Sequence, residues 1–167
     1  MRAMLAPALL WTSVIDCGLM AGVYFAFSAF IMTSLGRIAP ASGMVAMNAT
    51  IVDIVKSPFM PVFMLTTLTA ASLAVLGVVR WGQPGSMLIV IGGTIYVLGM
   101  FGVTMVVNQP MNEALLAADP ATSQGVALWS RYVIDWTMWN HLRTVASTVA
   151  TAIFTAALTL QRGAPCA

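Results

Sequence analysis

The fold is decided by residues 59–107, which read FMPVFMLTTLTAASLAVLGVV, RWGQPGS and MLIVIGGTIYVLGMFGVTMVV in turn. Residues 59–79 and 87–107 carry no charged side chain. Each is long enough as a helix to cross a hydrocarbon core of about 30 Å, which takes roughly 20 apolar residues. The segment between them contains glycine and proline, which interrupt helices and favour turns. This stretch therefore predicts a tight antiparallel hairpin of two transmembrane helices.

Two further apolar segments, about 8–34 and 142–160, are also long enough to span a bilayer. The chain of 167 residues is 60% hydrophobic and only 7% charged, whereas soluble domains carry about a quarter charged residues. So few charges cannot cover an apolar core in water. We expect an all-α integral membrane protein, in which residues 1–167 form a single four-helix transmembrane domain.

The two longer connections are also expected to be helical. Residues 41–56 place Met44, Met47 and Ile51 at spacings of three and four, a pattern typical of an amphipathic helix. We expect this helix to lie flat at the membrane interface, between helices one and two. Residues 122–141 contain no glycine or proline beyond Gly125. The fourth helix should therefore be long and extend beyond the bilayer.

The basic residues are scattered single side chains. An even number of spans places both termini on one side with Arg2, Arg80 and Arg162, opposite Arg37, Lys56, Arg131 and Arg143. Long connections count less in the positive-inside rule, which favours cytoplasmic termini, and we expect a bacterial inner membrane. Without a run of lysine or arginine to follow phosphates, nucleic-acid binding is not expected.

Asp16 is an ionisable residue within the apolar run of helix one. A carboxylate at that depth costs several kcal/mol unless it is paired or meets water. A functional role and a structural hydrogen bond to a neighbouring helix are both compatible with the sequence. Gly18 and Gly22 lie on another face, where small residues at this spacing allow close packing of helices.

Helix three ends in two asparagines, Asn108 and Asn112, on either side of Pro110. A proline inside a helix removes one backbone donor and is expected to halt the helix here. The last carbonyl groups then lack their usual partners. The two amide side chains either cap this break or hold a substrate.

The most informative pattern is one polar and aromatic stripe before the fourth span. Spacings of three and four place five residues on one helical face: Trp129, Tyr132, Trp136, Asn140 and Arg143. An aromatic belt at the headgroup level explains the rings alone, but not the two polar residues that continue the stripe. The guanidinium of Arg143 either holds an anionic ligand or pairs with Asp135 or Glu113.

His141 is the single histidine of the chain and a candidate for proton transfer near neutral pH. On a helical wheel it lies about 100° from the aromatic stripe, so a direct contact with Trp136 is not implied. A single histidine and no cluster of thiolates do not support a transition-metal site. We therefore expect no bound metal.

Three motifs together resemble one family of small membrane proteins. They are GVYFAFS at 22–28, VTxxxNxPxN at 103–112 and WxxYxxxWxxWNHxR at 129–143. The chain resembles the DUF1772, or anthrone oxygenase-like, family over nearly its whole length. The resemblance implies a cofactor-independent oxygenase that oxidises an anthrone-like or phenolic aromatic to a quinone with dioxygen.

The resemblance implies specific roles for residues already described. Deprotonation of the anthrone gives an electron-rich anion that passes an electron to dioxygen, so the protein must supply a base, a flat surface and a counter-charge. These roles fall to His141 as the base, with Asp16 as an alternative, to Arg143 as the counter-charge, to Tyr132 and Trp136 as stacking rings, and to Asn108, Asn112 and Asn140 as amides that orient the oxygens.

Two other functions are compatible with the sequence. The chain could be a non-catalytic subunit of a larger membrane complex, docked through its glycine faces, or a homo-oligomer. It could also be a small quinone- or lipid-binding protein or a transporter, although a transporter usually shows repeated halves and several intramembrane charges. The expected partners are membrane lipid and an aromatic or quinone small molecule.

Overall fold

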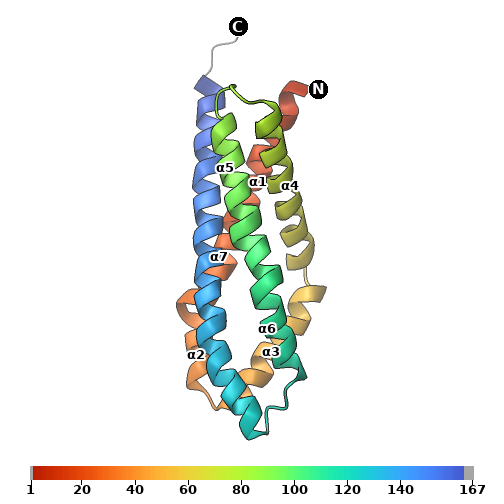
Figure 1. Ribbon diagram of the computed structural model, residues 1–167, viewed down its shortest axis with the longest axis vertical. Helices are drawn as coiled ribbons and strands as arrows, with labels where there is room; N and C mark the ends of the chain where they lie inside the picture. The colour runs from red at the N-terminus through yellow and green to blue at the C-terminus, as the bar shows by residue number, and fades with distance from the viewer. Residues whose placement is uncertain (1, 164–167) are drawn as a thin grey trace.

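The computed structural model describes the backbone of residues 2–163 and the side chains of residues 7–161, so the charges of Arg2 and Arg162 lie outside it. Within that part the chain is helical, with no strand. The helices run along one long axis, and the start of α1 lies at the same end as the end of α7 (Figure 1). The expected all-α architecture is confirmed.

Four stretches are long and apolar enough to cross a membrane: Pro7–Arg37, Phe59–Val79, Ser86–Ala117 and Ser123–Gln161. The first comprises most of α1 (Arg2–Ala26), the π-helical turn η1 (Phe27–Ile31) and α2 (Met32–Arg37). The second is α4 (Phe59–Val79), which has the predicted bounds. The fourth lies within α7 (Ser123–Gly163), a helix of 41 residues. The long fourth helix is therefore confirmed.

The third stretch continues past the point where the sequence predicted an end. It consists of α5 (Ser86–Tyr96), the π-helical segments η2 (Val97–Gly102) and η3 (Thr104–Asn108), and α6 (Gln109–Ala117). The prediction that Pro110 halts this helix was wrong. Pro110 lies in the first turn of α6, where a missing N–H costs least. The preceding π-helical turns, with their wider i→i+5 spacing, accommodate the change in hydrogen bonding.

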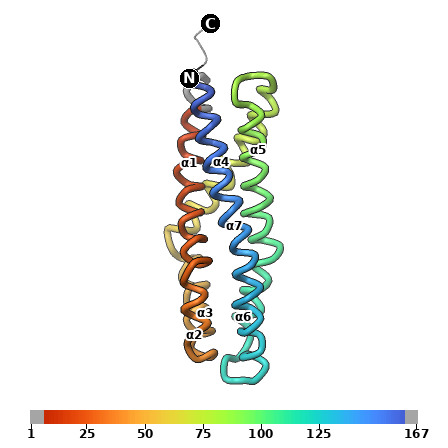
Figure 2. Tube along the Cα trace, turned by 90° about the vertical axis from the view of Figure 1, so that its left-hand side faces the viewer, coloured from red at the N-terminus to blue at the C-terminus, as the bar shows by residue number. Residues whose placement is uncertain are grey.

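The connection between the first two spans is the helix α3 (Pro40–Lys56). Met44, Met47 and Ile51 are buried, so the amphipathic pattern is confirmed. They pack with Leu115 and Trp129 in a common apolar cluster. The helix α3 contacts α2, α6 and α7, and it slants along the lower part of the bundle (Figures 1 and 2). It is therefore an integral part of the bundle below α4.

The molecule has two apolar cores, one in each half of its length. The upper core lies where α1, α4, α5 and α7 pack on one another and includes Leu10, Leu73 and Phe154. The lower core lies between α2, α3, α6 and the first half of α7. Phe59 and Phe101 border the upper core from below, while Phe27 borders the lower core. The candidate site lies where these two cores meet.

Glycines of the third stretch allow the closest helix packing. A Cβ on Gly93 would lie 2.5 Å from the carbonyl oxygen of Ala70 in α4, and a Cβ on Gly99 would lie 2.7 Å from Ala146 in α7. The expectation for helix one was wrong, because a Cβ on Gly22 would meet nothing within 4 Å and one on Gly18 would touch only Thr151 at 3.9 Å. Spacing alone did not reveal which glycines face a neighbouring helix.

Candidate functional site

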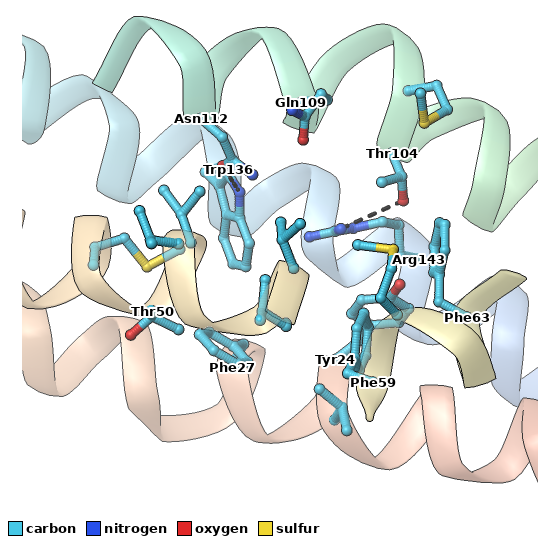
Figure 3. A pocket seen from close by; sticks show the side chains of 18 of the residues that line it. Tyr24, Phe27, Thr50, Phe59, Phe63, Thr104, Gln109, Asn112, Trp136 and Arg143 are labelled. Atoms are coloured by element: carbon cyan, nitrogen blue, oxygen red, sulfur yellow. Dashed lines mark hydrogen bonds between the residues drawn. The ribbon is translucent and has the colours of Figure 1, made fainter. Parts of the chain in front are cut away.

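A pocket with a volume of about 770 Å³ lies between α1, α3, α4, η3, α6 and α7. One part of its wall is aromatic and includes Tyr24, Phe27, Phe59, Phe63, Phe101 and Trp136. Polar side chains are interspersed among the aliphatic ones in the rest of the wall: Thr50, Lys56, Thr104, Gln109, Asn112, Glu113 and Arg143. Figure 3 shows the labelled members of this wall around one common space. Its size and its largely apolar lining are typical of sites for small organic ligands.

Arg143 is the charged group at the centre of this pocket. Its side chain is only 4% exposed, and Figure 3 shows its guanidinium directed into the space between Trp136 and Thr104. Nη2 donates a hydrogen bond of 2.7 Å to Oδ1 of Asn140, and Nη1 donates a longer one of 3.4 Å to Oγ1 of Thr104. The Nε–H finds no hydrogen-bond acceptor in the described part of the protein.

The neighbours of Arg143 are aromatic rings. Its guanidinium carbon lies 4.5 Å from the ring centroid of Tyr24 and 4.9 Å from that of Trp136, both within range of cation–π attraction. No carboxylate among the described side chains forms an ion pair with it, so the pairing with Asp135 or Glu113 considered from the sequence is not formed. Among the side chains that the structure describes, Arg143 is thus a buried cation without a counter-ion.

Asn140 holds Arg143 in place. Its Nδ2 donates hydrogen bonds of 2.7 Å to the carbonyl oxygen of Tyr24 and of 2.7 Å to Oγ of Ser28, while its Oδ1 accepts from Arg143. Both ends of this fully buried amide are therefore occupied by protein groups. Asn140 is a positioning residue between α1 and α7 and does not line the pocket.

Asn112 reaches the pocket from α6. Its Oδ1 accepts a hydrogen bond of 2.7 Å from the hydroxyl of Tyr132 and one of 3.0 Å from Nε1 of Trp136. Two donors on one atom identify that atom as the oxygen. The Nδ2 group then has no protein acceptor among the described residues, and Figure 3 shows it on the side facing the cavity. Asn112 therefore presents a fixed hydrogen-bond donor to a ligand.

The remaining members of the predicted stripe support the pocket from below. Trp129, Tyr132 and Trp136 stack in sequence, with ring centroids 5.8 and 6.0 Å apart. Trp136 is the member that lines the pocket, while Tyr132 and Trp129 are buried in the lower core. Asn108 is also buried, and its Nδ2 lies 3.4 Å from the carbonyl oxygen of Trp136. Asn108 and Asn112 therefore both contact residues of the stripe on α7.

The structure does not bring the two proposed bases into this site. His141 follows Asn140 directly, but it is exposed and does not line the pocket. Asp16 is half-buried in the upper half of α1, and its Oδ2 has no hydrogen-bond partner among the described residues. Successive residues on a helix point about 100° apart, which explains why His141 faces away from Arg143.

Several pocket residues were not assigned a role from the sequence. Tyr24 and Phe27 lie in the GVYFAFS motif, yet neither carries an obvious chemical signal. Glu113 was considered only as an ion-pair partner of Arg143, whereas it lines the pocket and accepts a hydrogen bond of 3.2 Å from Gln109. The four-residue spacing of Gln109 and Glu113 was the available signal for their pairing.

Comparison with known proteins supports the resemblance seen in the motifs. The model of one protein family, described as anthrone oxygenase, matches residues 49–153. No curated protein and no solved structure matches the chain. The matched range runs from α3 into α7 and contains the polar wall from Thr50 to Arg143. Because this range covers more than half of the sequence, the chain belongs to the anthrone oxygenase family.

Proposed function

We propose that the pocket binds an anthrone-like or phenolic aromatic and that the chain oxidises it to a quinone with dioxygen. One observation carries the proposal: within the described part of the chain the buried guanidinium of Arg143 has no counter-ion, and it faces a cavity walled by aromatic rings. An aromatic oxyanion would provide a negative charge for the guanidinium and a flat apolar body that fits between the aromatic rings. Membership of the anthrone oxygenase family supports this choice of substrate.

The guanidinium lowers the energy of the anion on which the reaction depends. A buried cation is unfavourable by itself, because it has lost its hydration. An oxyanion beside Arg143 replaces the lost hydration by attraction between opposite charges. This attraction is strong in surroundings of low dielectric constant. The interaction is weaker with the neutral anthrone than with the anthrolate. The site therefore favours loss of the proton.

The reaction balances without a further reagent. The methylene carbon of the anthrone loses a proton, and the resulting anion transfers one electron to dioxygen. The radical pair combines to form a C–O bond. The peroxide then loses water as its O–O bond breaks and the second C–H hydrogen leaves as a proton, which gives the carbonyl group. One anthrone and one dioxygen thus yield one quinone and one water.

Glu113 is the proton acceptor in this proposal. Among the described residues it is the one carboxylate that lines the pocket. Its hydrogen bond from Gln109 fixes it on the wall that also carries Asn112. Glu113 is also exposed at the surface, which leaves its carboxylate a path to release the proton. His141 and Asp16 lie outside the lining, so they would need an indirect path to the substrate.

The test measures oxygen consumption by the purified protein with a simple anthrone. We expect a rate well above the spontaneous one and a decrease of about 100-fold in Glu113→Gln, which is within the usual contribution of general base catalysis. His141→Ala is the matched control and should retain at least half of the activity. The reverse pattern would identify His141 as the base. A wild-type rate equal to the spontaneous one would exclude the oxygenase function.

A further inference from the structure

The polarity of the pocket changes from one end to the other. The end formed by α4 and η2 is apolar and includes Phe63, Met64 and Phe101. The side formed by α3 and α6 carries Lys56, Gln109 and Glu113 among apolar side chains such as Ile51 and Leu116, and we call it the polar end. Arg143 lies beside Phe63 and Thr104, whereas Asn112 lies on α6 beside Trp136 (Figure 3). A ligand with an apolar body and polar oxygens would find both kinds of group in this lining.

The apolar end continues into the lipid-facing surface of the bundle. Met64 is 44% exposed and belongs to the span Phe59–Val79, and Met105 is 48% exposed and belongs to the span Ser86–Ala117. Both side chains also line the pocket. Their helical neighbours Leu68 and Val106 are exposed and apolar. Pocket and membrane surface therefore share a boundary at these two methionines.

The helices pack closely above and below this boundary but not at the boundary itself. Above it, α4 packs on α5 and η2, and below it, α3 packs on α6. Between these contacts, Met64 of α4 and Met105 of η3 both line the pocket and are exposed at the surface, and we call this place the side opening. Methionine side chains are unbranched and flexible, so they can move aside at little cost.

We infer that an aromatic ligand dissolved in the bilayer enters the pocket through the side opening, between Met64 and Met105. A polycyclic aromatic concentrates in the hydrocarbon region because burial of apolar area is favourable. The side opening lets it move from lipid to the aromatic wall without crossing water. The route through the polar end would take it past the charged groups of Lys56 and Glu113. This inference concerns the access of the ligand, and it requires the pocket to bind an aromatic but not to oxidise it.

The test follows binding of 9,10-anthraquinone, used as a non-reacting probe, to the protein in lipid vesicles. Quenching of tryptophan fluorescence after rapid mixing of protein vesicles with probe-loaded vesicles gives the association rate. The double variant Met64→Trp/Met105→Trp places two indoles across the side opening. We expect its association rate to fall about 10-fold. Leu68→Trp is the matched control, because Leu68 lies one turn along the same lipid-facing side of α4 and outside the pocket lining.

The control should remain within twofold of the wild type. Equal rates for the double variant and the wild type would overturn the inference, and so would a decrease in Gln109→Trp without one in the double variant, because that pattern indicates access from the polar end. Failure of the probe to bind the wild type would also overturn it. If the double variant does not fold, Met105→Trp alone serves the same comparison. Because no oxygen is consumed, the result is independent of the oxygenase test.

Discussion

The upper half of the bundle and the junction above the lower core are held together in different ways. In the upper half, helices approach through glycine, as where Gly93 faces the backbone of Ala70. At the junction, side chains join the helices: Asn140 connects α7 to α1, and Asn112 connects α6 to α7. Close backbone contact leaves no room for a ligand, whereas a network of side chains can surround a cavity. The pocket lies where the second kind of contact replaces the first.

The largest effect should come from removing the charge at the junction. In Arg143→Met the anion loses its counter-charge, and we expect oxygen consumption to fall by about 100-fold or more, equivalent to about 2.7 kcal/mol or more. The melting temperature should change little, because removing a buried charge that lacks a counter-ion offsets the cost of leaving Oδ1 of Asn140 without its donor. Activity and thermal unfolding of the same preparation check both expectations.

An active Arg143→Met protein would contradict the role of the guanidinium. A large loss of stability would instead show that Arg143 is chiefly a structural link at the junction. Arg143→Lys is the matched control, because it keeps the charge but loses the fork of donors. We expect its activity to lie between those of the wild type and the methionine variant.

The second prediction tests whether glycine packing holds the upper half of the bundle together. Gly93→Ala adds a Cβ at 2.5 Å from the carbonyl oxygen of Ala70, which forces α4 and α5 apart. Overpacking of this kind typically costs about 1–3 kcal/mol, and thermal unfolding in detergent should show it. Gly22→Ala is the control, because its Cβ would meet nothing within 4 Å. Equal stability of the two variants would mean that glycine packing does not hold this half together.

The smallest effect concerns the donor that Asn112 presents to the ligand. Asn112→Asp keeps an oxygen for Tyr132 and Trp136 but replaces the Nδ2 donor by a second acceptor. We expect KM for an anthrone with a second oxygen substituent to rise about 10-fold, equivalent to about 1.4 kcal/mol. The KM for an unsubstituted anthrone should change less. Steady-state oxygen consumption with both substrates measures the difference, and an equal rise for both would argue against a direct hydrogen bond.

Much of the fold followed from the sequence, because length and hydropathy act locally. The bounds of α4 agree with the predicted span, and the long α7 follows from the absence of helix breakers. The third span was mispredicted at its end, since proline stops some helices and is tolerated in the first turn of others. Only the π-helical turns before Pro110 show which outcome applies.

The sequence by itself determined that four stretches are long and apolar enough to span a membrane, because length and hydropathy are local properties. It also determined that five aromatic and polar residues share one face of α7, because helical periodicity fixes which residues of a single helix lie together. Only the tertiary structure decided what that face meets. Tyr24, Thr104 and Asn112 come from different helices and surround Arg143 and Trp136. His141 stays outside, although it adjoins Asn140 in sequence. Contacts between helices depend on their relative rotation and shift, which side-chain packing over the whole bundle sets and no single segment encodes.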